Sequence, residues 1–472
     1  MARIVMVGAG VVGMSTAMLL ARDGHDVTVL ERDDAPPPDV PDDAWTSWTR
    51  RGVNQFRLLH FFLPRFRALV DEELPEVVDA AERLGALRYN PVLLAPAELT
   101  GGPRTGDDAY TSVTGRRPVM EAAVASVALR TPGLTIRRGV AVAGLETGTS
   151  TTPGVPHVTG VRTDTGEILD ADLVVDMTGR RSALPGWLDA IGARPVDEEV
   201  EDSGFVYYGR HFRSADGSVP PALGGLLQHY GSVSLLTLPA DNGTWGVGFI
   251  TSARDAQLRA LRDVDRWSAA LKAFPLVAHW ADGAPLDDSV AVMAKIEDRH
   301  RNLCIDGTPV ATGVVAVADS WACTNPSLGR GISIGFLHGR ALRDLLRSQP
   351  LDDPLELARA WHATTEETVE PWYRSTLAFD RHRLAEIDAA VEGVPYEPGD
   401  PEWELTHALE AAALHDGDVL RAFLSIASLV SLPDEAIARP GVLDKAIELG
   451  SGWRDEPLPG PDRPTLLATI AG

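Results

Sequence analysis

The sequence predicts an α/β protein that begins with a parallel β-α-β unit and ends in a helical region. A short apolar strand at residues 3–7 leads through a glycine-rich turn into a helix over 14–23, and a second strand follows at 26–31. Short alternating runs separated by Gly and Thr-Pro fill residues 134–175 and indicate strands. Beyond Pro350 the sequence is acidic, and its pattern predicts mostly helices. Together these patterns predict a Rossmann-like domain, a mixed β-sheet domain and a helical carboxy-terminal region.

The individual elements follow from the same patterns. Amphipathic helices are expected near residues 55–69 and 74–84, and another should begin at Pro118, because proline suits the first turn of a helix. A β-meander is expected around 147–165, with a returning strand at 173–175. In the run 235–249, the turn signal Asp241-Asn242-Gly243 predicts a hairpin, and Val314–Val317 reads as one more buried strand.

Composition excludes several classes of function. The chain has 472 residues, of which 44% are hydrophobic and 23% charged, as in soluble globular proteins. Its 67 acidic residues against 43 Lys and Arg give a formal net charge of −24, which makes nucleic acid an unsuitable partner. No run approaches the ~18–20 apolar residues of a membrane span. The two cysteines, Cys304 and Cys323, match no metal-ligand spacing, so we expect no metal and a cytoplasmic protein.

The first motif with a chemical meaning is Gly8-x-Gly10-x-x-Gly13. Gly8 permits a tight turn, Gly10 lets a pyrophosphate approach the backbone, and Gly13 lets helix and strand pack closely. The helix that follows offers free N–H groups to an anion. Glu31 ends the next strand, where its carboxylate can accept hydrogen bonds from an adenosine ribose. The motif predicts dinucleotide binding but does not by itself separate NAD from FAD.

A second motif lies about 300 residues later. The strand Val314–Val317 runs into Ala318-Asp319-Ser320, and a loop leads to Asn325-Pro326-Ser327-Leu328-Gly329-Arg330-Gly331 at the entrance of a helix. The acid can bind a polyol hydroxyl, and the glycines expose backbone N–H groups where a planar heterocycle can sit. A dehydrogenase that binds only NAD has no reason to repeat such a loop, so this reading is set aside.

A third motif stands between them. Asp176-Met177-Thr178-Gly179-Arg180-Arg181-Ser182 follows the strand 173–175, and its Asp and Gly either contact a ligand or shape the turn. In this order the three motifs resemble those of the class A FAD-dependent monooxygenases, the para-hydroxybenzoate-hydroxylase-like superfamily with a GR2-type FAD-binding domain. The resemblance covers roughly residues 1–345. Two departures stand out: the usual Asp-Gly pair is spread over Asp176 and Gly179, and Ala318 replaces a glycine.

The resemblance implies the cofactor contacts. Ala318 is compatible with it if that residue has a negative φ. Arg117, at the start of a helix, looks like the family's FAD-contacting arginine, and the segment 51–55 looks like the loop beside the isoalloxazine ring. The cofactor-binding residues expected in this way are Gly8, Gly10, Val11, Val12, Gly13, Glu31, Arg32, Gln55, Arg117, Val142, Asp319, Pro326, Leu328, Gly329, Arg330, Gly331 and Ile332.

The resemblance also implies the reaction. NADH or NADPH would reduce FAD, O2 would form a flavin C4a-hydroperoxide, and one oxygen atom would pass to a small organic substrate by hydroxylation or epoxidation. The alternatives are an FAD-dependent dehydrogenase or oxidase and a non-catalytic flavin-binding protein. Halogenation is set aside, because no lysine precedes Lys272 and the GWxWxIP sequence of flavin-dependent halogenases is absent.

Catalytic residues are not identified by any motif. On the strand 205–212 successive side chains alternate between faces, and one set faces the substrate pocket. The weak candidates are Arg51, Gln55, Tyr207, Arg210 and His211. The expected domains are 1–75 with 112–190 and 300–350 for FAD, 76–111 with 191–299 for the substrate, and 351–472 as a helical region. A homodimer is possible.

Overall fold

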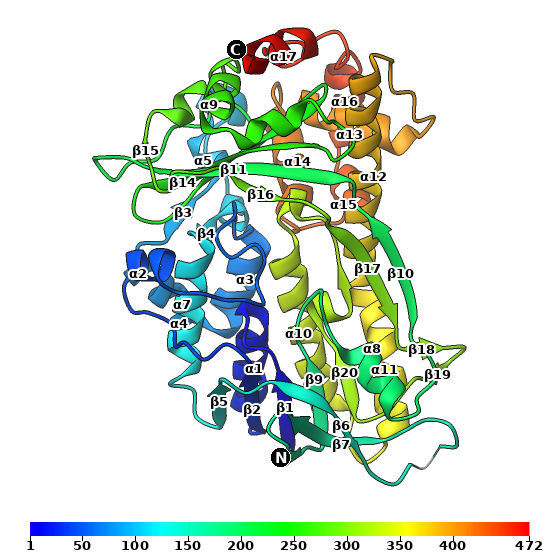
Figure 1. The fold of residues 1–472 in the computed structure, drawn as a ribbon. Helices are drawn as coiled ribbons and strands as arrows, with labels where there is room; N and C mark the ends of the chain where they lie inside the picture. The colour runs from blue at the N-terminus through cyan, green and yellow to red at the C-terminus, as the bar shows by residue number, and fades with distance from the viewer. Residues whose placement is uncertain (151, 472) are drawn as a thin grey trace.

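A computed structural model describes residues 1–150 and 152–471 of the chain (Figure 1). Residue 151, in the predicted meander, and residue 472, at the end of the predicted helical region, lie outside the described residues. The predicted division into three domains stays a prediction. Within the described residues, no helix combines the length and the apolar character needed to cross a membrane.

The amino-terminal part is built on a sheet of five parallel strands in the order β20-β9-β1-β2-β5. The strands are β1 (Arg3–Val7), β2 (Asp26–Glu31), β5 (Leu134–Arg138), β9 (Leu173–Asp176) and β20 (Val314–Ala316). Helix α1 (Val11–Arg22) connects β1 to β2 and packs against α7 (Arg117–Ala128) and α10 (Gly331–Ser348). The predicted β-α-β unit and Rossmann-like sheet are therefore confirmed.

Helices α1 and α10 approach each other closely because of two glycines. A Cβ atom on Gly339 would lie 2.0 Å from Oγ1 of Thr16, and one on Gly335 would lie 3.1 Å from a methyl group of Val12. Larger residues at these positions would push the helices apart. The packing sets the amino termini of α1 and α10 on the same side of the parallel sheet.

Smaller elements surround this sheet. The predicted meander is the three-stranded antiparallel sheet β6-β7-β8. Its strands are β6 (Val142–Thr147), β7 (Val158–Thr163) and β8 (Ile168–Asp170). Nearby are α2 (Pro41–Thr46), α3 (Pro64–Glu73), α4 (Pro75–Arg83), β3 (Leu87–Tyr89), α5 (Pro91–Leu94), α6 (Ala97–Thr100), β4 (Ser112–Thr114) and α8 (Leu184–Ala190), with a 3-10 turn at Asp107–Tyr110.

The predicted helix over 55–69 is wrong in its first half. Helix α3 begins only at Pro64, and residues 55–63 are irregular. The residue before a proline is driven out of the helical region, and Leu63 is extended at φ −63° and ψ 156°. Leu59 instead lies on three glycines of a β-sheet, where a Cβ on Gly209 would come within 2.3 Å of its side chain.

That sheet has six strands in the order β12-β13-β14-β11-β15, with β16 also paired to β11. All of its pairings are antiparallel, so it is not the mixed sheet that the sequence predicts. Its strands are β11 (Phe205–Arg213), β12 (Leu227–Tyr230), β13 (Val233–Pro239), β14 (Thr244–Ser252), β15 (Ala284–Pro285) and β16 (Ala291–Met293). Helix α9 (Val264–Lys272) and 3-10 turns at Leu258–Arg262 and Ala278–Ala281 lie in the same region.

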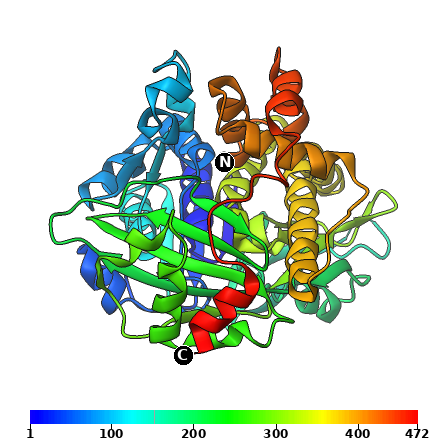
Figure 2. The ribbon, with the colours of Figure 1, turned by 90° about the horizontal axis from the view of Figure 1, so that it is seen from above.

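Short strands join this sheet to the rest. They are β10 (Asp197–Asp202), β17 (Glu297–Asn302), β18 (Cys304–Ile305), β19 (Thr308–Pro309) and β21 (Ala322–Cys323). The carboxy-terminal region is helical, as predicted, with α11 (Pro354–Thr368), α12 (Glu370–Glu392), α13 (Pro401–Ala412), α14 (Gly417–Ala427), α15 (Pro433–Ile437) and α16 (Val442–Gly450). From α16 a coil crosses back to the six-stranded sheet, where α17 (Arg463–Ala471) packs against α9 (Figure 2).

The predicted hairpin also links two parts of the fold. Asn242 and Gly243 turn the chain at φ 51° and 64° between β13 and β14. Just before them, the fully buried Asp241 accepts hydrogen bonds from the backbone N–H of Arg116 at 2.7 Å and from its guanidinium at 2.7 and 3.0 Å. Arg116 precedes α7, so a buried ion pair fastens the hairpin to the parallel-sheet region.

We predict that Asp241→Ala lowers the free energy of unfolding by about 3–5 kcal/mol, because it removes the buried carboxylate that pairs with Arg116 and leaves this buried cation with the exposed Asp42 at 3.4 Å. Urea unfolding measures the change. Glu167→Ala is the control, since its ion pair with Arg137 is exposed and should contribute less than about 1 kcal/mol. Equal effects of the two substitutions would contradict this account.

Candidate active site

One continuous cavity of about 2700 Å³ extends from the glycine turn after β1 to the carboxy-terminal helices. Ligand pockets typically measure about 300–1000 Å³, so this cavity has room for a large cofactor and a substrate together. Every residue that the sequence predicts as a cofactor contact lines it.

The first glycine turn forms one end of the cavity. Gly8 has φ 107°, and a Cβ there would lie 2.6 Å from the carbonyl oxygen of Met177. A Cβ on Gly13 would lie 2.3 Å from the carbonyl oxygen of Gly8. Gly10, in contrast, has nothing within 4 Å of its Cβ position and precedes α1 without a side-chain cap. The turn therefore leaves open space at the amino terminus of α1, which suits a pyrophosphate.

Glu31 lies beside this turn in a buried cluster of charges. Its carboxylate accepts the backbone N–H of Ala9 at 2.9 Å and the guanidinium of Arg50 at 2.7 Å. Arg50 also pairs with Asp33 at 3.2 Å and Glu121 at 2.8 Å, and its side chain is only 3% exposed. Three carboxylates thus share one arginine, and Glu31 still lines the cavity. Among the described residues, Oε1 of Glu31 accepts only the N–H of Asp33, so it can still accept a hydrogen bond from a ribose hydroxyl.

Three other predicted contacts lie near this cluster. Arg117 is 8% exposed, lines the cavity and pairs with Glu121 at 2.8 Å. Arg32, which is exposed, and Val142, which is half-buried, also line the cavity. Arg117 therefore combines a structural ion pair with access to the cavity.

The second motif lines the same cavity. Asp319 lies in a 3-10 turn at Ala318–Ser320, and its carboxylate makes no hydrogen bond within the part of the chain that the structure describes. Burial raises the pKa of Asp319, while Arg180 and Arg117 act in the opposite direction. A carboxylate that faces a cavity without a protein partner suits a polyol chain such as ribityl. After a 3-10 turn at Pro326–Leu328, α10 begins at Gly331 without a side-chain cap, so its first amides face the same space.

The condition set for Ala318, a negative φ, is not met. Its φ is +57°, in the left-handed region, not negative. The backbone N–H of Ala318 donates to Nδ1 of His338 at 3.1 Å, and His338 stacks on Trp361 at 4.5 Å. These contacts hold a conformation that costs a non-glycine residue about 1–3 kcal/mol.

In the third motif, Asp176 has a structural role. Its carboxylate is 1% exposed and accepts hydrogen bonds from the backbone N–H of Thr178 at 3.0 Å and from the hydroxyls of Thr178 and Ser182. Gly179 has φ 84°, and its N–H donates to Ser320 at 3.0 Å, which ties this turn to the second motif. Residues 177–181 line the cavity, so this turn forms part of the cavity wall, and Asp176 holds the turn in its conformation.

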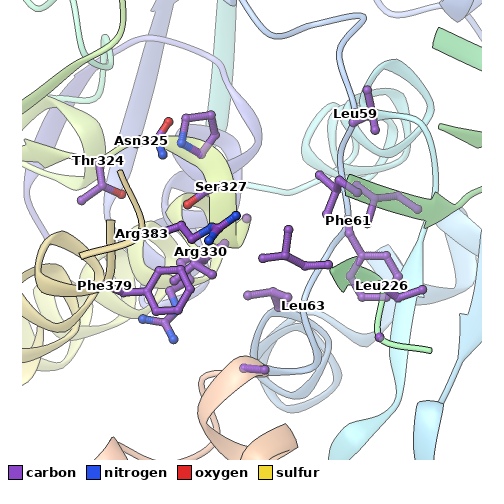
Figure 3. A pocket seen from close by; sticks show the side chains of 18 of the residues that line it. Leu59, Phe61, Leu63, Leu226, Thr324, Asn325, Ser327, Arg330, Phe379 and Arg383 are labelled. Atoms are coloured by element: carbon purple, nitrogen blue, oxygen red, sulfur yellow. The ribbon is translucent and has the colours of Figure 1, made fainter. Parts of the chain in front are cut away.

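A hydrogen-bond network supports the loop 324–330 from behind. The Tyr207 hydroxyl donates to the side-chain oxygen of Asn325 at 2.6 Å, and the Asn325 amide donates to Asp380 at 3.2 Å. Ser327 also donates to Asp380, which is 2% exposed and whose second oxygen has no partner within the described residues. In Figure 3, Arg330 of this loop lies beside Phe379 and Arg383, and Leu59, Phe61 and Leu63 form the facing wall.

The catalytic candidates separate into two groups. Gln55 lines the cavity, and Tyr207 stands just behind it. Arg51 is exposed and does not line it. Arg210 packs over Phe212 and Trp267, and His211 packs against Trp45 at 4.7 Å, so both are held in the protein interior.

Sequence reasoning missed three groups. Arg50, beside the candidate Arg51, is the arginine that reaches the cavity. His60 lines the cavity, and burial together with Arg117 holds its pKa well below the ordinary value. Asp380 comes from α12, far from every motif. The run Arg50–His60 carries no regular periodicity, so only the structure shows which side chains point inward.

Comparison with known proteins agrees with this geometry. Residues 3–77 match a family model described as FAD dependent oxidoreductase. A flavoprotein/dehydrogenase from Cytophaga hutchinsonii has a TM-score of 0.61 at 16% identity, covering 96% of this chain and 98% of that one. PqsL from Pseudomonas aeruginosa, described as a probable FAD-dependent monooxygenase, has a TM-score of 0.58 at 16% identity, covering 82% and 99%. Residues 3–77 therefore match an FAD-dependent oxidoreductase domain, and the fold of the chain is shared with these flavoproteins.

The fold that the resemblance implies is confirmed, because the chain shares it with structures described as a probable FAD-dependent monooxygenase and as a flavoprotein/dehydrogenase. Among the curated proteins, Protein Rv3254 of Mycobacterium tuberculosis is 29% identical over 390 residues, which are 78% of this chain and 77% of that protein. The similarity to Rv3254 extends beyond the segment that the family model matches.

We predict that Asp319→Ala lowers the FAD content of the purified oxidoreductase. We expect the Asp319 carboxylate to accept a charge-assisted hydrogen bond from the ribityl chain, and the loss of such a bond costs on the order of 1.5–3 kcal/mol. The ratio of flavin to protein absorbance measures it, with the exposed Asp352→Ala as control. Unchanged flavin content in Asp319→Ala would exclude this role.

A second prediction concerns pH. Burial raises the pKa of Asp380 from 3.8 to about 7, so between these values the folded oxidoreductase keeps a proton that the unfolded chain has lost. The contribution of Asp380 to the free energy of unfolding is therefore greatest at low pH, and it falls as the pH rises towards 7. Asp380→Asn mimics the protonated form, so its melting temperature relative to the wild type should rise between about pH 4 and pH 8. A difference that does not change with pH, or an equal effect of the exposed Asp455→Asn, would contradict this.

Proposed function

We propose that this oxidoreductase is an NAD(P)H-dependent monooxygenase that inserts one oxygen atom into an organic substrate. The observation that carries the proposal is the continuity of the cavity, which joins both glycine-rich motifs to a largely apolar compartment. A compartment of this kind lets a substrate lie against the cofactor while its walls keep out bulk water.

The residues fit FAD in a definite order. Open space at Gly10 and the uncapped start of α1 suit the pyrophosphate. Glu31 suits the adenosine ribose, and the free carboxylate of Asp319 suits the ribityl chain. The uncapped start of α10 at Gly331 suits the anionic edge of the flavin ring. When bound, FAD supplies hydride acceptance from NAD(P)H and activation of O2.

The protein's own part is to bind, orient and exclude water. Leu59, Phe61 and Leu63 present an apolar wall opposite the loop 324–330 (Figure 3). Such a wall removes water from the place where the substrate meets the cofactor, and water there would divert reduced oxygen to hydrogen peroxide. The Tyr207–Asn325–Asp380 network holds the loop from behind. Because the cofactor supplies the oxygen chemistry and the protein binds the substrate and excludes water, the reaction needs no nucleophilic side chain.

A dehydrogenase or oxidase is the second candidate, because one similar structure is described as a flavoprotein/dehydrogenase. A non-catalytic flavin-binding protein is the third. The choice of NADH or NADPH, a homodimer and a cytoplasmic location stay predictions.

An absorption spectrum before and after NAD(P)H addition under air tests the proposal. We predict a yellow protein whose flavin bands bleach while oxygen is consumed. A flavin that NAD(P)H reduces only when a substrate is added also agrees with a monooxygenase. A flavin that a substrate reduces without NAD(P)H would favour the dehydrogenase or oxidase, and a protein that takes up no FAD would exclude all three functions.

A further inference from the structure

One part of the cavity is lined mainly by carboxy-terminal elements and not by the glycine-rich motifs. We call it the distal lobe: it is lined by β12, by α12 and α13, and by the coil that follows α16. In Figure 2 this coil, drawn in red, crosses from the carboxy-terminal helices to the six-stranded sheet. Its far end is fixed by the ion pair of Arg463 with the buried Asp255 at 2.6 Å. Gly460 fits there because a Cβ would come within 2.9 Å of Tyr230.

Several polar side chains of the distal lobe are already paired. Glu386 accepts hydrogen bonds from Nε1 of Trp403 at 2.8 Å, from Nε2 of His407 at 2.6 Å and from Arg383 at 2.9 Å. His382 is bonded on both ring nitrogens, to Tyr396 at 2.9 Å and to Asp400 at 3.0 Å. These groups brace the wall and have little capacity left for a ligand.

Glu410 differs from them. Its carboxylate lines the lobe and makes no hydrogen bond within the described residues, and Nδ1 of His407 lies 3.9 Å from it. Burial raises the pKa of Glu410, while His407 and Arg383 oppose the rise. A carboxyl group in this position is an acceptor that a ligand can use.

His229 on β12 also has a free side. Its Nδ1 lies 3.0 Å from Oγ of Ser234, and that oxygen accepts a hydrogen bond from Nε of Arg383 at 3.0 Å. With one lone pair used by Arg383, the Ser234 hydroxyl proton is free to donate to Nδ1 of His229. The neutral ring then carries its proton on Nε2, which makes no other hydrogen bond within the described residues.

The two groups belong to the same neighbourhood. Ser234, which contacts His229, accepts from Arg383, and Arg383 pairs with Glu386 at 2.9 Å. Glu386 in turn contacts Nε2 of His407 at 2.6 Å, and Nδ1 of the same ring lies 3.9 Å from Glu410. The distal lobe therefore presents the Nε2–H donor of His229 and the carboxylate acceptor of Glu410 in a wall that also contains the aromatic rings of Phe379 and Trp403.

We propose that the distal lobe binds a bulky, predominantly hydrophobic substrate and that Glu410 and His229 recognise a hydroxyl or amide group at the end remote from the flavin. The inference rests on the proposed function, since the cofactor must occupy the end of the cavity at the glycine motifs. A hydroxyl or amide has both the donor that Glu410 needs and the acceptor that His229 needs. The cavity volume of about 2700 Å³ leaves space for several fused rings beyond the cofactor.

The test compares two probes of nearly equal size, 1-pyrenemethanol and 1-methylpyrene, on the FAD-loaded protein. Pyrene emission reports its own environment, so binding is read independently of flavin reduction. We expect 1-pyrenemethanol to bind about tenfold more tightly, as a pair of hydrogen bonds to groups that line the cavity would give. Glu410→Gln and His229→Phe should each reduce this preference, while Glu448→Gln, exposed on α16, should leave it unchanged.

Equal affinities of the two probes for the wild-type protein would overturn the assignment of Glu410 and His229. Failure of both probes to bind would overturn the hydrophobic substrate class. Flavin content and NAD(P)H reduction are measured on the same samples. A protein that holds reducible FAD and shows no preference refutes only this inference, whereas a protein without FAD refutes the proposed function.

Discussion

The close packing of α1 on α10 is the constraint on which the site depends. Gly335 and Gly339 bring α10 against Val12 and Thr16 at distances that no larger side chain would allow. The two helices are separated by more than 300 residues in the sequence, yet this contact makes both amino termini open onto one cavity. Each terminus has unpaired backbone N–H groups, so the cavity has two places that favour negative charge.

Buried charge is arranged around this frame in two ways. Near the first glycine turn, Arg50 neutralises Glu31, Asp33 and Glu121 together, and the cluster joins the ends of β1 and β2 to α7. Behind the second motif, Asp380 accepts hydrogen bonds from the loop side chains but forms no ion pair within the described residues, and burial raises its pKa to about 7. The first cluster is held by ion pairing, whereas the second is held by hydrogen bonds and is most stable at low pH, where Asp380 is protonated.

The sequence could predict what depends on local pattern. The β-α-β unit, the three motifs and the hairpin at Asp241–Gly243 each need particular residues at short spacing, and all are present in the structure. Every predicted cofactor contact also lines the cavity. The inward turn of Arg50 rather than Arg51 could not be predicted, because residues 51–63 are irregular and follow no period. The positive φ of Ala318 depends on His338, and the distal lobe depends on helices far along the chain.

Hydrogen–deuterium exchange of the protein with and without FAD tests the central claim most directly, namely that one cavity holds the cofactor at one end and leaves the distal lobe for a substrate. FAD should slow exchange together at residues 8–13 and at residues 318–332, and leave residues 405–411 on α13 unchanged. Slower exchange at the first segment alone, or equal protection of α13, would contradict the account.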